Sequence, residues 1–384
     1  MAIDRRQFIG LGLGVLLTGV RPVAAAPATQ RLIGCRSNAQ GEHFLSLVDS
    51  SGRQLMDIRL PARGHDVAVD PTQRLAAVFA RRPGEYVWIV ELIEGLVLRK
   101  IEAANGRHFY GHGVFTPDGR HLLCSENDFA TGDGVIGVYD AGAEFRRIGE
   151  LPSHGIGPHE IRLLADGRTL VVANGGIRTH PDLPRVKANL DSMRPNLAYI
   201  DSADGSLLRR FEPAQQWHQL SIRHIDVSPD DHVAIAMQFE GRPQLQPPLI
   251  ALQYGEQAMR MVSPPAAIER RLKNYCGSVA FNAAGTGFAV SSPRGGLVTL
   301  WSVTGEYVGA HEQADACGIS PDAIDDAGYF ISDGGGRLLQ VDRQASVVGQ
   351  HALATFRWDN HLQTLVPSGT GAAAYVSDRQ TAPS

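Results

Sequence analysis

A histidine recurs at a nearly constant interval along this 384-residue chain, each time where a new strand is predicted to begin. The series is His65 in RGHDVAVDP, His112 in YGHGVFTPDGR, His159 in GPHEIRLLADGR, His224 in IRHIDVSPDD and His361 in WDNHLQTL. The first two intervals are both 47 residues, and two further units keep the frame with Cys276 and Cys317 in place of histidine. A repeat of about 40 to 50 residues cannot bury its own apolar face, so it must stack on copies of itself. Seven units therefore predict an all-β fold, a seven-bladed β-propeller.

The second unit shows the predicted strands of one blade most plainly. They cover residues 112–115, 121–125, 134–139 and 145–151. The turn TPDGR separates the first two strands, because Pro presets φ while Asp and Gly tolerate a tight reversal. Apolar residues alternate with a period of two elsewhere, and no segment keeps a helical period over 11 residues or more.

The last unit is incomplete at the C-terminus, which predicts how the ring closes. Strands expected at residues 31–36, 43–49 and 54–60 would complete its blade, although residues 373–377 are an alternative second strand. Pairing of the N- and C-terminal strands would remove an open sheet edge. Residues 27–384 are therefore expected to form one propeller domain.

The first 26 residues have the features of an export signal. The segment DRRQFIG precedes a short apolar run and then the small residues VAAA. This apolar run is too short to cross roughly 30 Å of hydrocarbon, so we expect a twin-arginine signal peptide rather than a membrane span. The mature protein is expected in the periplasm, exported in its folded state.

The charge of the chain excludes one class of partner. The chain has 36 basic and 40 acidic residues, a net charge of −4. Proteins that bind nucleic acid neutralise phosphates with a basic face, so no nucleic-acid partner is expected. The sequence also lacks the GxSxG, HExxH, CxxCH, Walker and EF-hand patterns, so no enzyme class is indicated by a motif.

The recurring histidines define a candidate metal site at one mouth of the central channel. Equivalent residues of successive blades are related by rotation about the channel axis, so at least three of the five imidazoles should reach a common point. The candidate ligands are His65, His112, His159, His224 and His361. Neutral imidazole suits Cu, Fe or Zn. A structural interpretation also stays open, in which each histidine bonds a neighbouring backbone group and holds two blades in register.

Charged residues flank the same position in several units. They are Arg63, Asp66, Arg107, Glu160, Arg223 and Asp359. Such groups orient imidazoles, bind an anionic ligand or pair with one another. The first unit leaves its register open, because His65 lies six residues before the turn proline whereas His112 and His224 lie five before theirs. Successive strand residues point to opposite faces, so Asp66 is an alternative equivalent of the other histidines.

The four cysteines matter because the expected compartment is oxidising. Cys35 and Cys124 occupy the same strand position in two different blades and should lie too far apart to pair. Cys276 and Cys317 open adjacent blades near the channel mouth. For this second pair a disulfide, a ligand role and simple burial all stay open.

Two insertions break the repeat. The interval from His159 to His224 is 65 residues, and the surplus falls in residues 174–195; residues 241–248 form a shorter insertion. A long loop in a compact domain is usually functional or disordered. We expect the first insertion to lie over one face, available to a ligand or partner.

Several phrases of the chain closely resemble one bacterial family. They are NGGIRTHPD, LDSMRPNLAYID, QLSIRHIDVS, NYCGSVAFN, SSPRGG and DACGIS, and the family is domain-of-unknown-function family 1513. The resemblance covers essentially the whole mature chain and implies an exported propeller of the YVTN/WD40-like type. Members are often encoded beside imelysin-type periplasmic proteins linked to iron, which implies such partners and a role in iron or metal handling. The resemblance assigns no catalytic residue.

These observations favour a non-enzymatic function, the binding of a partner or a metal-related ligand in an iron-linked system. The alternative is a metalloenzyme, an oxidoreductase or a hydrolase, with a histidine-rich site at the channel mouth. The sequence does not identify a cofactor, and a transition metal, Cu, Fe or Zn, is the candidate.

Overall fold

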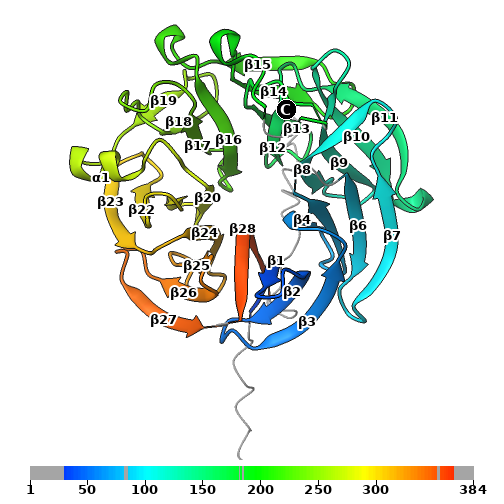
Figure 1. The fold of residues 1–384 in the computed structure, drawn as a ribbon, viewed down its shortest axis with the longest axis horizontal. Helices are drawn as coiled ribbons and strands as arrows, with labels where there is room; N and C mark the ends of the chain where they lie inside the picture. The colour runs from blue at the N-terminus through cyan, green and yellow to red at the C-terminus, as the bar shows by residue number, and fades with distance from the viewer. Residues whose placement is uncertain (1–29, 82–84, 181, 184–185, 353–354, 367–384) are drawn as a thin grey trace, which may run out of the picture.

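Seven four-stranded sheets surround a central axis (Figure 1). The computed structural model describes residues 30–81, 85–180, 182–183, 186–352 and 355–366. All strand pairs within the sheets are antiparallel, as in β4 with β5 and in β8 with β9. The predicted seven-bladed β-propeller is therefore confirmed.

The blades follow one another along the chain, and each begins with its innermost strand. Blade 1 contains β4 (Gly64–Val69), β5 (Leu75–Ala80), β6 (Tyr86–Glu91) and β7 (Leu96–Glu102). Blade 2 contains β8 (Arg107–Phe115), β9 (His121–Asp128), β10 (Gly134–Asp140) and β11 (Arg146–Pro152), and blade 3 contains β12 (Pro158–Leu163), β13 (Thr169–Asn174), β14 (Asn196–Asp201) and β15 (Leu207–Phe211). Blade 4 contains β16 (Leu220–Val227), β17 (Val233–Phe239), β18 (Ile250–Gln253) and β19 (Arg260–Val262). Blade 5 contains β20 (Ser278–Phe281), β21 (Gly287–Ser292), β22 (Leu297–Ser302) and β23 (Tyr307–Glu312), and blade 6 contains β24 (Ala316–Pro321), β25 (Tyr329–Asp333), β26 (Arg337–Val341) and β27 (Val347–Ala352).

Blade 7 is built from both ends of the described chain. Its innermost strand is β28 (Phe356–Leu365), followed outward by β1 (Arg31–Asn38), β2 (His43–Asp49) and β3 (Gln54–Leu60). The β28–β1 pairing runs from Arg31 opposite Leu365 to Asn38 opposite Phe356. Backbone hydrogen bonds between the N-terminal and C-terminal strands thus close the ring.

The hydrophobic core lies between the faces of adjacent blades. Each neighbouring pair shares a buried cluster: Phe79 and Phe109 lie in the cluster between blades 1 and 2, and Phe330 and Trp358 lie in the cluster between blades 6 and 7. The same arrangement repeats at the other interfaces. Because every blade packs against a neighbouring blade on both sides, the positions of the inner strands around the axis are fixed.

Two local predictions need correction. The inner strand of blade 2 starts at Arg107 rather than at residue 112, and a short helix, α1 (Ala266–Arg271), occupies a connection that showed no helical period. This helix has six residues, which is shorter than the window in which periodicity can be detected. The expected signal peptide, residues 1–26, and residues 373–377 lie outside the described residues. Within the described part of the chain, no helix is long and apolar enough to span a membrane.

The inner strands carry β-bulges at the level of the recurring histidines. In β4 the pairing register with β5 shifts between Gly64 and Val67, so His65 and Asp66 fall inside the bulge. Similar shifts occur in β8, β12, β16, β24 and β28, whereas β20 pairs regularly. A bulge lets successive residues point to the same side. This resolves the open register of blade 1, because both His65 and Asp66 reach the channel.

Candidate metal centre

The five recurring histidines form one buried cluster in the channel. His112 lies at its centre, with ring centroids 4.8 Å from His65, 4.7 Å from His159, 4.7 Å from His361 and 5.8 Å from His224. The other four rings surround it, with neighbouring centroids 4.7 to 5.9 Å apart. No member is more than 7% exposed. The structure therefore brings together all five residues that the sequence analysis proposed as ligands.

Two groups of three histidines have the spacing of a metal site. One group is His65, His112 and His361, and the other is His112, His159 and His224. Within each group the nitrogen atoms that can act as ligands lie within 4.8 Å of one another. The buried Nε2 atoms of His112 and His361 have no hydrogen-bond partner among the described residues. These nitrogens are therefore available as ligands.

Carboxylates from neighbouring blades orient three of the imidazoles. Asp66 of blade 1 bonds Nδ1 of His112 in blade 2 at 3.1 Å, and Glu160 of blade 3 bonds Nδ1 of His224 in blade 4 at 3.2 Å. Asp359 of blade 7 lies 3.4 Å from Nδ1 of His65 in blade 1. A carboxylate on one ring nitrogen fixes the tautomer and leaves the other nitrogen to a metal. The same contacts also join adjacent blades, although through carboxylates rather than through backbone groups.

His159 lacks such a carboxylate. Asp66 directly follows His65, and Glu160 directly follows His159. The residue that directly follows His112 is instead Gly113. A Cβ at Gly113 would lie 2.3 Å from Phe79 Cζ and 2.7 Å from a backbone oxygen, so packing excludes a side chain there. Nδ1 of His159 is consequently buried without a hydrogen-bond partner among the described residues.

Burial lowers the pKa of four of the imidazoles and so favours their neutral form. It lowers the pKa of His65 and His159 well below the usual value, with Arg223 adding to the effect at His159. Burial beside His112 lowers the pKa of His361 to about 3. Burial also lowers the pKa of His224, although its hydrogen bond to Glu160 opposes this. Metals bind neutral imidazole, so these four rings do not have to lose protons before they accept an ion.

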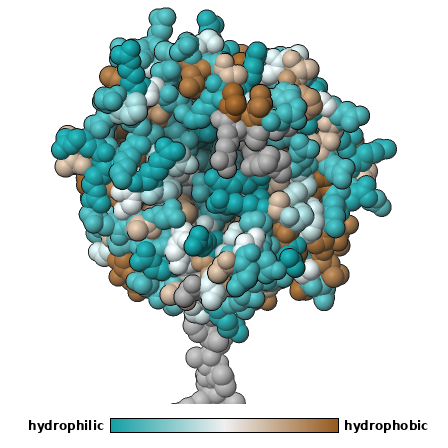
Figure 2. Space-filling model, viewed as in Figure 1, coloured by the Kyte–Doolittle hydropathy of each residue, from teal (hydrophilic) through white to brown (hydrophobic). Residues whose placement is uncertain are grey.

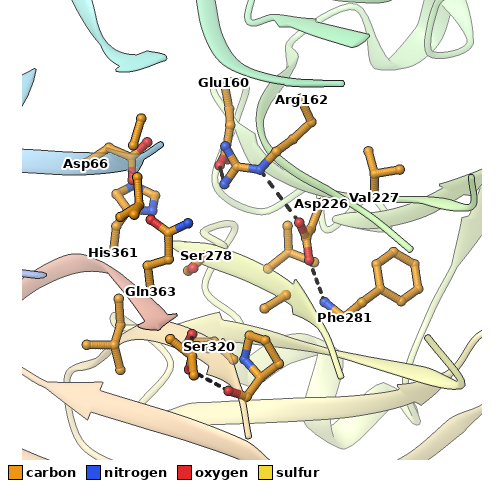
Figure 3. Close-up of a pocket in the computed structure, with 18 of the residues that line it drawn as sticks. Asp66, Glu160, Arg162, Asp226, Val227, Ser278, Phe281, Ser320, His361 and Gln363 are labelled. Carbon is orange, nitrogen blue, oxygen red and sulfur yellow. Dashed lines mark hydrogen bonds and ion pairs between the residues drawn. The ribbon is translucent and has the colours of Figure 1, made fainter. Parts of the chain in front are cut away.

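The pKa values of two of these carboxylates, Glu160 and Asp66, are lowered by charged and hydrogen-bonding groups around them. Burial raises the pKa of Glu160, but the nearby charge of Arg162 and the hydrogen bond from His224 outweigh it and bring the pKa to about 2. Arg162 contacts Glu160 at 2.5 Å and Asp226 at 3.6 Å, and this array lines the channel in Figure 3. At Asp66, His112 outweighs burial and holds the pKa well below its usual range.

Arginines at the mouth hold the third carboxylate. Arg81 donates to Asp359 at 2.7 Å, and Arg63 donates to the other carboxylate oxygen. Asp359 is 2% exposed, so both guanidinium groups cover a buried negative charge. The two arginine contacts hold Asp359 beside His65.

Cavities lie on both sides of the histidine cluster. On the mouth side is a cavity of about 140 Å³, here called the vestibule. It is lined by His65, Arg81, Tyr110, His159, Arg223, His224, Gln238, Tyr275 and Asn360. Farther along the inner strands is a cavity of about 370 Å³, here called the inner cavity, whose wall includes Asp66, Glu160, Asp226 and His361 (Figure 3). Figure 2 shows that the face it displays is hollowed at its centre and mainly hydrophilic there.

Three residues placed near the site by the sequence analysis do not join the cluster. Cys276 and Cys317 are buried free thiols, so the disulfide considered for this pair is absent. Burial raises the pKa of Cys276 to about 12 and also raises the pKa of Cys317, whose Sγ donates to the Asp315 carbonyl at 3.1 Å. Arg107 lies at the start of β8 and pairs with Glu150 at 2.7 Å.

The structure also adds residues that sequence reasoning missed. Arg81 follows the second strand of its blade, and Arg162 lies two residues after Glu160. Neither position repeats in the other blades, so no periodic signal marks them. Tyr110 lies two residues before His112, and its inclusion in the bulge of β8 explains why it lines the vestibule.

The first insertion packs beside the vestibule. The Tyr110 hydroxyl lies 2.7 Å from Thr179 Oγ1 and donates to the Ile177 carbonyl at 3.4 Å. Asn189 accepts from the Arg178 backbone at 2.7 Å, which ties two parts of the insertion together. The described part of the insertion therefore contacts the wall of the candidate site.

The fold and site define a class: a seven-bladed propeller with a buried histidine cluster across its channel. The chain belongs to the family DUF1513, described as a protein of unknown function, whose model matches residues 58–365. Among solved structures, the chain is similar to hydrazine synthase from Kuenenia stuttgartiensis, with a TM-score of 0.60 and 13% identity over 81% of this chain and 95% of that chain. At this identity the similarity shows the fold alone. No curated protein sequence matches the chain.

Proposed function

We propose that this propeller binds a transition-metal ion at the histidine cluster and acts as a non-enzymatic metal-binding protein. One observation carries the proposal: five buried imidazoles converge, and carboxylates orient three of them. Holding blades together requires pairwise contacts only. It does not require His112 to contact four other histidines.

The spacing of the nitrogens fits an ion after small movements. Three atoms within 4.8 Å of one another have a common point within about 2.8 Å of each. Bonds from imidazole nitrogen to zinc are about 2.0–2.1 Å long, so each ring needs to move inward by less than about 1 Å. Because His112 belongs to both groups, an ion bound by His112 can take its other ligands from the His65 and His361 side or from the His159 and His224 side of the cluster.

The donor set indicates which metals to expect. All five candidate ligands are imidazoles, which suit Cu, Zn and Fe, whereas Mg and Ca prefer oxygen ligands. Three imidazoles leave an open coordination position, so an additional small ligand has a place at the ion.

The cellular setting completes the proposal. The twin-arginine leader supports export, and a folded passenger can acquire its metal before it crosses the membrane. The resemblance to a family encoded beside imelysin-type proteins supports a place in periplasmic iron or metal handling, with such proteins as partners. We therefore expect the protein to bind iron, copper or zinc in the periplasm.

Metal analysis of protein purified without a His-tag tests this function. The wild type is expected to contain about one ion per chain, and the double substitution His112→Ala with His224→Ala should remove it. His121→Ala with His311→Ala is a matched control, because these two histidines lie on β9 and β23 outside the cluster. Circular dichroism reports whether each variant is folded. A folded double variant that retains the wild-type metal content would refute the ligand assignment.

A further inference from the structure

The two sides of the histidine cluster differ in charge. Among the described residues that line it, the wall of the inner cavity carries the carboxylates Asp66, Glu160 and Asp226 and the one cation Arg162. The wall of the vestibule carries Arg81 and Arg223 and no carboxylate among the described residues that line it. Small anions therefore find a favourable potential on the vestibule side.

Arg223 is the unpaired cation of the vestibule. It occupies the bulge of β16 next to His224, and its Nε reaches the amide oxygen of Gln238 at 3.4 Å. Among the described residues it has no carboxylate within ion-pair distance. Arg81 differs, because Asp359 already neutralises it. A half-buried guanidinium with one weak neutral contact keeps most of its hydrogen-bonding capacity for a ligand.

His159 provides a second, independent indication. It is 7% exposed and lines the same vestibule, and its Nδ1 has no partner among the described residues because Gly113 stands where a carboxylate would be needed. Arg223 lies close enough to lower the pKa of His159. An unsatisfied buried nitrogen beside an unpaired cation marks a place where a polar ligand supplies the missing contacts.

We propose that the vestibule binds a small oxyanion, a carboxylate or an inorganic oxyanion, between Arg223 and the metal ion. This inference rests on the proposed function, because one oxygen of the anion would bind the ion that the histidines hold. A second oxygen accepts from the Arg223 guanidinium, whose fork matches carboxylate and phosphate geometry. The vestibule volume of about 140 Å³ admits an anion of a few heavy atoms.

Anion titration of the cobalt-loaded protein tests the site. Acetate, bicarbonate, phosphate and sulfate are added at constant ionic strength, and the visible absorption of cobalt reports ligand exchange. We expect saturable binding by the wild type and at least tenfold weaker binding by Arg223→Gln, since a hydrogen bond to a charged group is lost. Arg120→Gln is the control, because Arg120 lies in the exposed turn before β9 and should leave anion affinity unchanged.

The outcomes separate the anion site from the metal site. Equal anion affinity in the wild type and Arg223→Gln, at equal cobalt content, would overturn the vestibule site while leaving the metal centre intact. A protein that binds no cobalt, copper, iron or zinc would instead overturn the proposed function and, with it, the bridging ligand. A response to acetate and bicarbonate alone identifies a site for planar anions of carboxylate shape, whereas a response to phosphate or sulfate alone identifies a site for tetrahedral oxyanions.

Discussion

Asp66→Asn should weaken metal binding without unfolding the propeller. Asp66 is 6% exposed and lies 3.1 Å from Nδ1 of His112, the histidine shared by both candidate ligand groups. A hydrogen bond to a charged group contributes about 1.5–3 kcal/mol, and a neutral one about 0.5–1.5 kcal/mol. Asparagine keeps the neutral bond, so the expected loss is about 1–2 kcal/mol, or about 5- to 30-fold in Kd. Substitutions of groups that hydrogen-bond a metal ligand typically weaken metal affinity about 10- to 100-fold, which overlaps this range.

Competition with a chromophoric chelator measures the Kd of each variant. The matched control is Glu126→Gln, which also replaces a buried carboxylate by an amide. Glu126 accepts from Tyr139 at 2.7 Å and from Arg147 at 3.0 Å, and neither partner belongs to the cluster. The control should leave the Kd unchanged even if it lowers the melting temperature. If Asp66→Asn bound metal with the wild-type Kd, the reasoning that makes His112 an oriented ligand would be wrong.

Two further predictions concern stability. The pKa of His361 is about 3 in the folded protein and about 6.5 in the unfolded chain, so below pH 6.5 the unfolded state binds more protons. The unfolding free energy of the metal-free protein should therefore fall as pH drops from about 6.5 towards 3, and His361→Gln should flatten this profile in urea titrations. Separately, Ile235→Asp should destabilise the fold by about 3 kcal/mol or more, because Ile235 is fully buried. Val227→Asp should destabilise the fold less, because this half-buried residue lines the inner cavity. Equal losses of stability in thermal melts would contradict the placement of Val227 in the cavity wall.

The sequence predicted the architecture because the repeat is carried by features with a local physical cause. Turn segments such as TPDGR and strands of alternating polarity recur in each unit, and the frame they set locates the inner strand of each blade. The same frame predicted that the five histidines would meet. Rotation about one axis brings equivalent residues together whatever the details of packing.

The sequence could not predict features that depend on irregular backbone. The choice between His65 and Asp66 rested on strict strand alternation, but the bulge in β4 turns both residues towards the channel. Arg81 and Arg162 were missed because they belong to single blades and not to the repeat. The pairing of each carboxylate with a histidine of the next blade also requires the blade-to-blade geometry, which no single unit contains.

The distribution of histidines around the ring supports the proposed metal site over simple inheritance of one residue from an ancestral blade. Duplication of an ancestral blade would repeat one residue in any blade, but the five histidines come from blades 7, 1, 2, 3 and 4, which are consecutive around the ring. Their ring centroids, 4.7 to 5.9 Å apart, show imidazoles that fill this part of the channel. Blades 5 and 6 carry the small thiols Cys276 and Cys317 instead, and burial raises the pKa of both, so they stay protonated and do not compete as ligands. Large imidazoles on five blades and compact thiols on two produce one asymmetric cluster centred on His112. The proposed single ion fits such an arrangement, whereas holding seven blades in register does not require it.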